Sequence, residues 1–161
     1  MYLSTNQMLK VTYFQNRFAS DNAELKAKAA AEGRTVAATV HTEWSWAEIT
    51  NMVMDRSKWA TFTAHDADAY SKAKQKFDAV VIAQMIEGGA RSASNVIAHY
   101  AVVLDIDDGI SVQDVQKDLS QYEYVLYSSG GTGIKHGERF RVILPLAKTL
   151  SAEQWADYSE S

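Results

Sequence analysis

The feature that most constrains how this chain can fold is an apolar run that ends in acidic residues, Tyr100-Ala-Val-Val-Leu-Asp-Ile-Asp-Asp108. Residues 102–104 predict a buried strand, because a short continuous apolar run is typical of a strand inside a sheet. Successive residues of a strand point to opposite sides. Asp105 and Asp107 are therefore expected to project together, while Ile106 faces the core.

This acid pair needs a compensating charge. Two carboxylates held on one side of a strand repel each other unless a proton or a cation lies between them. Mg²⁺ prefers carboxylate oxygens and is commonly held by one or two carboxylates together with substrate phosphates. We therefore expect Asp105 and Asp107 to hold Mg²⁺ or Mn²⁺. The alternative is a strand that runs out into an acidic turn closed by Asp108 and Gly109.

The segment that follows has the pattern of one helix and two strands. Apolar residues at 112, 115 and 119, with Ser111 as the cap, predict a short amphipathic helix. Strands are predicted at 123–127 and at 138–146. The stretch between them, 128–136, is rich in glycine.

This glycine-rich stretch has the composition of an anion-binding loop. Three of the four residues 130–133 are glycines, which permit unusual backbone angles and let main-chain N–H groups approach an anion closely. Positive charge follows immediately at Lys135, His136, Arg139 and Arg141. Acid pair, loop and basic strand together predict a site for metal-bound phosphate.

The combination resembles the archaeo-eukaryotic primase superfamily, also called primase-polymerases. The family's first motif, an apolar strand that ends Asp-hydrophobic-Asp, is matched by Asp105-Ile-Asp107. Phage replication members show Tyr-Thr-Thr-x-Ser-His, a short gap, and then Arg-Phe-Arg-Val-Ile-Leu-Pro-Leu. Here Tyr127-Ser-Ser-Gly-Gly-Thr132 precedes Arg139-Phe-Arg-Val-Ile-Leu-Pro-Leu146. Arg91 lies in a lead-in segment similar to that of phage members, and the resemblance covers residues 90–150.

Two family features are not matched in register. The phage histidine falls at Thr132, whereas in a Ser-Gly-Gly layout that begins at Ser129 the histidine is His136, so both positions stay open. The third family motif, an acid on a later strand, has no counterpart before Ser161. We therefore expect either an amino-terminal piece of a longer protein or a shortened relative, with impaired catalysis in the absence of the third acid.

The resemblance implies metal-dependent, template-directed nucleotidyl transfer, as a primase or DNA polymerase, in phage or mobile-element DNA replication. It assigns the divalent cations to the catalytic residues Asp105 and Asp107. It assigns nucleotide binding to a further set: Ser129, Gly130, Gly131, His136, Arg139, Arg141 and Arg91. The implied partners are nucleoside triphosphates, a single-stranded DNA template and a helicase domain or subunit, in the cytoplasm of a bacterial host.

Length and composition favour a single domain over residues 1–161. The chain has 161 residues, 47% of them apolar, which suffices for one core. It contains no cysteine, so a disulfide framework and thiolate metal sites are excluded, and a reducing compartment is expected. The net charge of −4 argues against indiscriminate coating of DNA, although 135–148 is locally basic. No apolar run is long enough to span a membrane.

The rest of the chain mixes helices and strands. Strands are predicted at 8–14 and 77–86, and helices at 22–32, ending at Gly33, and at 42–54, capped by Thr42 or Ser45. This mixture predicts an α+β fold, with a mainly antiparallel sheet and packed helices. Trp59, Phe62 and Tyr70 are candidates for stacking on a template base, although aromatic residues more often fill a core.

Two other functions fit parts of the pattern. A phosphatase of the haloacid dehalogenase type has a strand ending Asp-x-Asp-Gly-Thr, but Asp105-Ile-Asp-Asp-Gly109 has one residue too many and no threonine follows. A degenerate member of the primase-polymerase fold, kept as a nucleotide- or nucleic-acid-binding module, accounts for the missing third acid. The intact acid pair and the arginine strand favour the catalytic interpretation.

Overall fold

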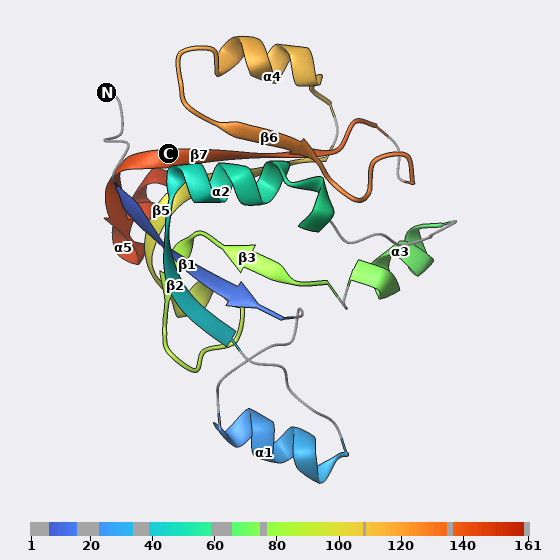
Figure 1. The fold of residues 1–161 in the computed structure, drawn as a ribbon, viewed down its shortest axis with the longest axis vertical. Helices are drawn as coiled ribbons and strands as arrows, with labels where there is room; N and C mark the ends of the chain where they lie inside the picture. Colours follow the sequence, from blue (N-terminus) through green and yellow to red (C-terminus); the bar gives the residue numbers. More distant parts are fainter. Residues whose placement is uncertain are drawn as a thin grey trace. The chain divides into compact units, whose positions relative to one another are not determined.

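The computed structural model describes residues 7–15, 23–33, 39–58, 66–74, 77–107, 109–134 and 137–159. These residues form antiparallel strand pairs and several helices, which confirms the expected α+β class (Figure 1). The elements are β1 (Met8–Phe14), α1 (Ala23–Ala31), β2 (Thr39–Ser45), α2 (Trp46–Met54), η1 (Arg56–Lys58), α3 (Ala67–Lys74), β3 (Ala79–Val81), β4 (Ala83–Met85), η2 (Ala93–Asn95), β5 (Val96–Ile106), α4 (Val112–Asp118), β6 (Val125–Ser128), β7 (Phe140–Ser151) and α5 (Ala152–Ser159).

The described residues group into two units that alternate along the chain. Unit 1 takes its described residues from Gln7, Ser45–Lys74 and Ala101–Ala147, and unit 2 takes its own from Met8–Trp44, Gln75–Tyr100 and Lys148–Ser161. The strands form one sheet of order β2-β1-β3 and one of order β4-β5-β7-β6. The acid pair, the glycine-rich loop and the arginine strand all belong to unit 1.

In unit 2, strand β1 is buried on both of its faces. Leu9 and Val11 are buried on one face, and Thr12 and Phe14 are buried on the other. The hydroxyl group of Thr12 donates a hydrogen bond to the carbonyl oxygen of Ala83 at 3.3 Å, so this buried polar group has a partner. The strand itself was predicted, whereas its second buried face was not.

The expected single strand at 77–86 is in fact two short strands in different sheets. β3 pairs antiparallel with β1, and β4 pairs antiparallel with β5. The change occurs at Ile82, which is buried and whose carbonyl oxygen accepts from the backbone N–H of Tyr100 at 3.5 Å. A continuous apolar run carries no periodicity that could mark such a change of sheet.

In unit 1, helix α4 covers one face of the strands that carry the candidate site. Ser111 caps this helix as predicted, because its side chain accepts from the backbone N–H of Asp114 at 3.1 Å. Val115, Phe140 and Val142 form the buried centre of the cluster beneath it. The half-buried residues packed against that centre are Ile106, Val112, Leu119, Tyr124, Leu126 and Leu144.

Helix α2 packs against β6 in the same unit. Ser45 and Glu48 form a reciprocal capping box at its start, and Ile49 and Val53 are the residues it buries. Of the two cap candidates, Ser45 is therefore the correct one, since Thr42 lies inside strand β2.

One expectation about β5 is wrong. The strand forms, but Val103 and Leu104 are 44% and 38% exposed rather than buried. β-Branched residues such as Val102 and Val103 suit a half-buried strand surface, so such a run predicts the strand better than its full burial.

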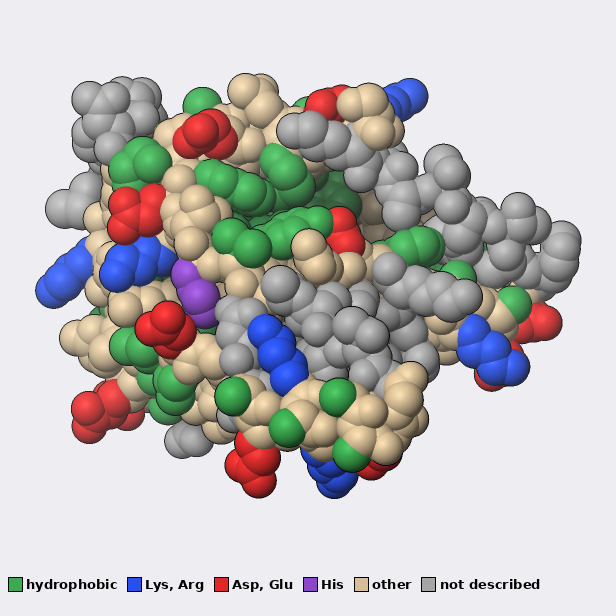
Figure 2. Space-filling model, turned by 60° about the horizontal axis from the view of Figure 1, so that its bottom comes forward, with side chains coloured by type: hydrophobic (Ala, Val, Ile, Leu, Met, Phe, Trp, Pro, Cys, Tyr) green, Lys and Arg blue, Asp and Glu red, His purple; other side chains and the backbone are tan. Residues whose placement is uncertain are grey.

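Charged side chains are interspersed on the face drawn in Figure 2, where lysines and arginines lie among acidic and hydrophobic side chains. Among the helices of the described ranges, none has both the length and the apolar character needed to cross a membrane.

Candidate functional site

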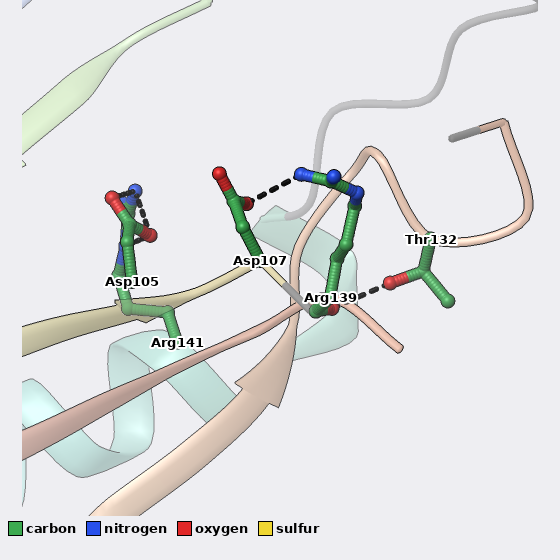
Figure 3. Close-up of polar contacts among 5 residues, drawn as sticks. All are labelled: Asp105, Asp107, Thr132, Arg139 and Arg141. Atoms are coloured by element: carbon green, nitrogen blue, oxygen red, sulfur yellow. Dashed lines mark hydrogen bonds and ion pairs between the residues drawn. The ribbon is translucent and has the colours of Figure 1, made fainter. Parts of the chain in front are cut away.

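The candidate site begins at the end of β5. Asp105 is the penultimate residue of the strand and Asp107 follows its last residue, Ile106. Ile106 packs into the cluster beneath α4, so the two carboxylates project from the opposite face, as predicted (Figure 3). The side chain of Asp105 is 60% exposed and that of Asp107 is 74% exposed.

Two arginines lie against these carboxylates: Arg141 in the adjacent strand, β7, and Arg139 directly before the first residue of that strand. Arg141 donates from Nε to Oδ1 of Asp105 and from Nη2 to Oδ2, both at 2.7 Å. Arg139 Nη1 lies 2.6 Å from Oδ1 of Asp107. The four residues Asp105, Asp107, Arg139 and Arg141 are called the charge quartet below. Its two pairs run in opposite order along the two strands, as expected for antiparallel neighbours.

The cations of the charge quartet are much more buried than its anions. Only 16% of the Arg139 side chain and 34% of the Arg141 side chain are exposed. The pKa of Arg141 is raised, first by its hydrogen bond to Asp105, against the opposing effect of burial. Tyr127, which lies opposite Arg141 in the β6–β7 register, contributes a further hydrogen bond that raises this pKa. The guanidinium groups thus supply the compensating charge that the acid pair requires.

The glycine-rich loop is tied to the first residue of this arginine pair. The carbonyl oxygen of Arg139 accepts from the backbone N–H of Ser129 at 2.8 Å and from the hydroxyl group of Thr132 at 2.5 Å (Figure 3). Inside the loop, the N–H of Thr132 donates to Ser129 and the N–H of Ile134 donates to Gly131. Gly133 has a φ of 81°, a left-handed angle that favours glycine. The amides of Thr132 and Ile134 therefore serve the loop's own turns, and the amide of Ser129 serves the link to Arg139.

Gly131 has a packing role that its place in a phosphate loop did not suggest. It is buried, and a Cβ atom there would lie 3.3 Å from Cδ of Arg139 and 3.7 Å from Cε1 of Tyr70. Its φ is not in the left-handed region. Glycine at this position therefore lets the Arg139 side chain and the Tyr70 ring approach the loop backbone closely.

Tyr70 is a site residue whose position the sequence did not reveal. It is the buried residue of α3, and burial is the main cause of its raised pKa. Both arginines of the charge quartet lower this pKa and both carboxylates raise it, so the phenol group senses all four charges. The aromatic pattern had suggested either base stacking or core packing for Tyr70, and the observed burial agrees with packing.

The other predicted nucleotide-binding residues lie in different parts of the chain. Ser129 is half-buried and Gly130 lies in the first turn of the loop. Arg91 is exposed and belongs to unit 2, in the segment before η2. His136 and Lys135 lie outside the described residues, as do Trp59 and Phe62. The roles proposed for these residues remain predictions.

The donor set can be tested against the expected cation. The described ranges contain no group of three or more His, Cys, Asp or Glu side chains placed to hold a metal. Two exposed carboxylates on one strand face are nevertheless the protein share that Mg²⁺ usually receives when phosphates complete its coordination. The acid pair therefore fits a metal–phosphate complex better than a bare cation. Comparisons with protein-family models, with curated proteins and with solved structures found no match.

Proposed function

We propose that this chain carries out metal-dependent, template-directed nucleotidyl transfer, as a primase or DNA polymerase of phage or mobile-element replication. The observation that carries the proposal is the charge quartet. It sets two exposed carboxylates beside two guanidinium groups on one face of the sheet, where β5 ends and β7 begins. The resemblance of residues 90–150 to primase-polymerases supports the same interpretation.

In this proposal each pair of side chains has one task. Asp105 and Asp107 hold Mg²⁺ or Mn²⁺, which when bound activates the attacking oxygen and neutralises charge on the leaving group. Arg139 and Arg141 grip the phosphate oxygens of the incoming nucleoside triphosphate, because a guanidinium group donates two parallel hydrogen bonds. Ser129 and Gly130 border the triphosphate, and Gly131 keeps Arg139 in place.

The chemistry is a displacement at the α-phosphorus. A bond forms between this phosphorus and the oxygen of a 3′-hydroxyl group or of an initiating nucleotide. The bond to the bridging oxygen breaks, pyrophosphate leaves, and the hydroxyl proton passes to solvent. Such a reaction depends mainly on positioning and charge stabilisation, which is what an acid pair and an arginine pair on rigid strands can provide.

Incorporation of a labelled nucleotide on a single-stranded DNA template tests the proposal. With Mn²⁺ present, the wild-type chain should extend a primer or form a dinucleotide, and Asp105→Asn or Asp107→Asn should reduce the product to background. Asp118→Asn is the matched control, because Asp118 is an exposed acid at the end of α4. Full activity in both site variants would refute the assignment.

Nucleotide binding supplies a second test that does not depend on turnover. A nucleoside triphosphate with Mn²⁺ should raise the melting temperature of the wild type, since binding to the native state stabilises it. Gly131→Val should abolish this shift, because its side chain would displace Arg139. A shift that survives the substitution would place the nucleotide away from the loop.

A second candidate function is a non-catalytic nucleotide- or nucleic-acid-binding module of the same fold. The observation in its favour is that each carboxylate of the charge quartet is already paired with an arginine, as in a structural ion-pair network. This module would bind nucleotide without incorporating it. A melting-temperature shift that persists in Asp107→Asn, together with no product from the wild type, would favour it.

A further inference from the structure

The acids and the arginines of the charge quartet are bonded to each other. Both oxygens of Asp105 accept from Arg141, and Asp107 is paired with Arg139. The groups proposed to hold a cation are thus engaged by the groups proposed to hold phosphate. A cation that uses the oxygens of Asp105 or Oδ1 of Asp107, and a phosphate that uses the guanidinium N–H groups bonded to them, therefore compete with the present partners.

We propose that this pairing makes the site self-inhibited, so that it opens only for a divalent cation that is already bound to a polyphosphate. The inference rests on the proposed function and specifies its substrate as the metal–polyphosphate complex. Free cation and free polyphosphate are both disfavoured. The four ion-paired side chains change partners together.

A cation alone is disfavoured because of the arginines. If it took the two carboxylates, two guanidinium groups would lose their partners. Their side chains are largely buried, at 16% and 34% exposed, although the carboxylates that they contact are 74% and 60% exposed. Removing one member of such a part-buried ion pair leaves the other charge less well compensated, at a cost between those of an exposed pair and of a buried pair. The added positive charge would also lie beside both arginines.

A polyphosphate alone is disfavoured because of the carboxylates. If Arg139 and Arg141 turned to phosphate, Asp105 and Asp107 would face each other on one strand face without a cation. The new anion would add further negative charge beside them, and like charges at close range oppose ionisation. A metal–polyphosphate complex removes both difficulties, because the cation replaces the arginines at the acids and the phosphates replace the acids at the arginines.

The surroundings restrict the exchange to the ends of the arginine side chains. The backbone of Arg139 is fixed through its carbonyl oxygen by Ser129 and Thr132. Its aliphatic stem passes beside Gly131, next to the buried ring of Tyr70. Arg141 lies within β7, opposite Tyr127. Each guanidinium group can therefore change partner without movement of the strands.

Calorimetry with three ligands tests the inference on the full chain. The ligands are Mn²⁺ alone, a non-hydrolysable nucleoside triphosphate in metal-free buffer, and their preformed complex at the same ionic strength. The wild type should bind the complex at least about fivefold more tightly than either component, the lower end of the usual range for coupled sites. The part of each binding heat that is lost in Asp107→Asn measures binding at the charge quartet.

The arginine variants give opposite changes if the inference is correct. Arg139→Gln and Arg141→Gln should bind Mn²⁺ alone about threefold or more tightly than the wild type, because the acids are released. They should bind the complex about tenfold more weakly, which corresponds to about 1.4 kcal/mol. Arg141→Lys should fall between wild type and Arg141→Gln, since an ammonium group keeps the charge without the forked contact.

Lys72→Gln is the matched control, because it removes one positive charge of unit 1 from an exposed ion pair with Asp68. It should leave all three affinities unchanged, and urea titration verifies that every variant is folded. Equal wild-type affinity for Mn²⁺ alone and for the complex, with no gain in the arginine variants, would overturn the inference and leave the proposed function standing. Absence of any binding of the complex would overturn both.

Discussion

The ion pair between Asp105 and Arg141 allows a stability prediction whose size follows from its geometry. A fully desolvated hydrogen bond to a charged group contributes about 1.5–3 kcal/mol, and an exposed ion pair about 0.2–1 kcal/mol. This pair has two bonds of 2.7 Å, a mostly buried cation and a carboxylate that is 60% exposed. We therefore expect a coupling free energy of about 1 kcal/mol, between the two limits. The pair of Asp107 with Arg139 has one contact and a more exposed acid, so about 0.5 kcal/mol is expected.

A double-mutant cycle isolates each coupling. The first cycle compares wild type, Asp105→Asn, Arg141→Gln and the double variant, and the second does the same for Asp107 and Arg139. Unfolding is followed in urea, because guanidinium chloride would screen the ion pairs. With a typical urea slope, 1 kcal/mol moves the midpoint by about 0.5 M. A first-cycle coupling below about 0.3 kcal/mol, the error of such cycles, or a larger value for the second cycle would refute the ranking.

Three further predictions concern the rest of the fold. Burial lowers the pKa of His99, whose ring stacks on that of Trp155 with 4.3 Å between the ring centroids. The stability that neutral His99 contributes is therefore present above its unfolded pKa of 6.5 and is lost as the pH falls through the lower folded pKa. His99→Phe should narrow the difference between the urea midpoints at about pH 7.5 and about pH 5, and an unchanged difference would contradict this. Ser45→Ala should cost about 1 kcal/mol in urea titration through loss of the α2 capping box, whereas no loss would mean that the cap is dispensable. Val142→Ala should lower the free energy of unfolding by about 2–3 kcal/mol, because Val142 is buried beneath α4. Val103→Ala should lower it by less than about 1 kcal/mol, because Val103 is exposed, and the reverse order in thermal unfolding would contradict this.

The parts of the site that follow from local pattern were predictable. The period of two along a strand puts Asp105 and Asp107 on one side of their strand, and the same period puts Arg139 and Arg141 on one side of theirs. The pairing of β5 with β7, which no local pattern states, brings the arginines to the acids. Ser111 was predictable as a cap because a serine before an apolar helical pattern satisfies free backbone N–H groups.

The parts that depend on distant segments were not predictable. The burial of Tyr70 beside Gly131 joins α3 to a loop far along the chain, and no local pattern encodes such a contact. The change of sheet at Ile82 depends on two different partner strands. The exposure of Leu104 depends on what covers β5, whereas its branched neighbours determine only that the backbone is extended.

Crystallography with Mn²⁺ and a non-hydrolysable nucleoside triphosphate, using anomalous scattering from manganese, tests the central claim most directly. We predict a manganese peak at about 2 Å from carboxylate oxygens of both Asp105 and Asp107, the range for hard cations bound by oxygen. Arg139 and Arg141 should then contact phosphate oxygens instead of the carboxylates. A bound triphosphate elsewhere, with both arginines still paired to Asp105 and Asp107 and no manganese beside them, would contradict the account.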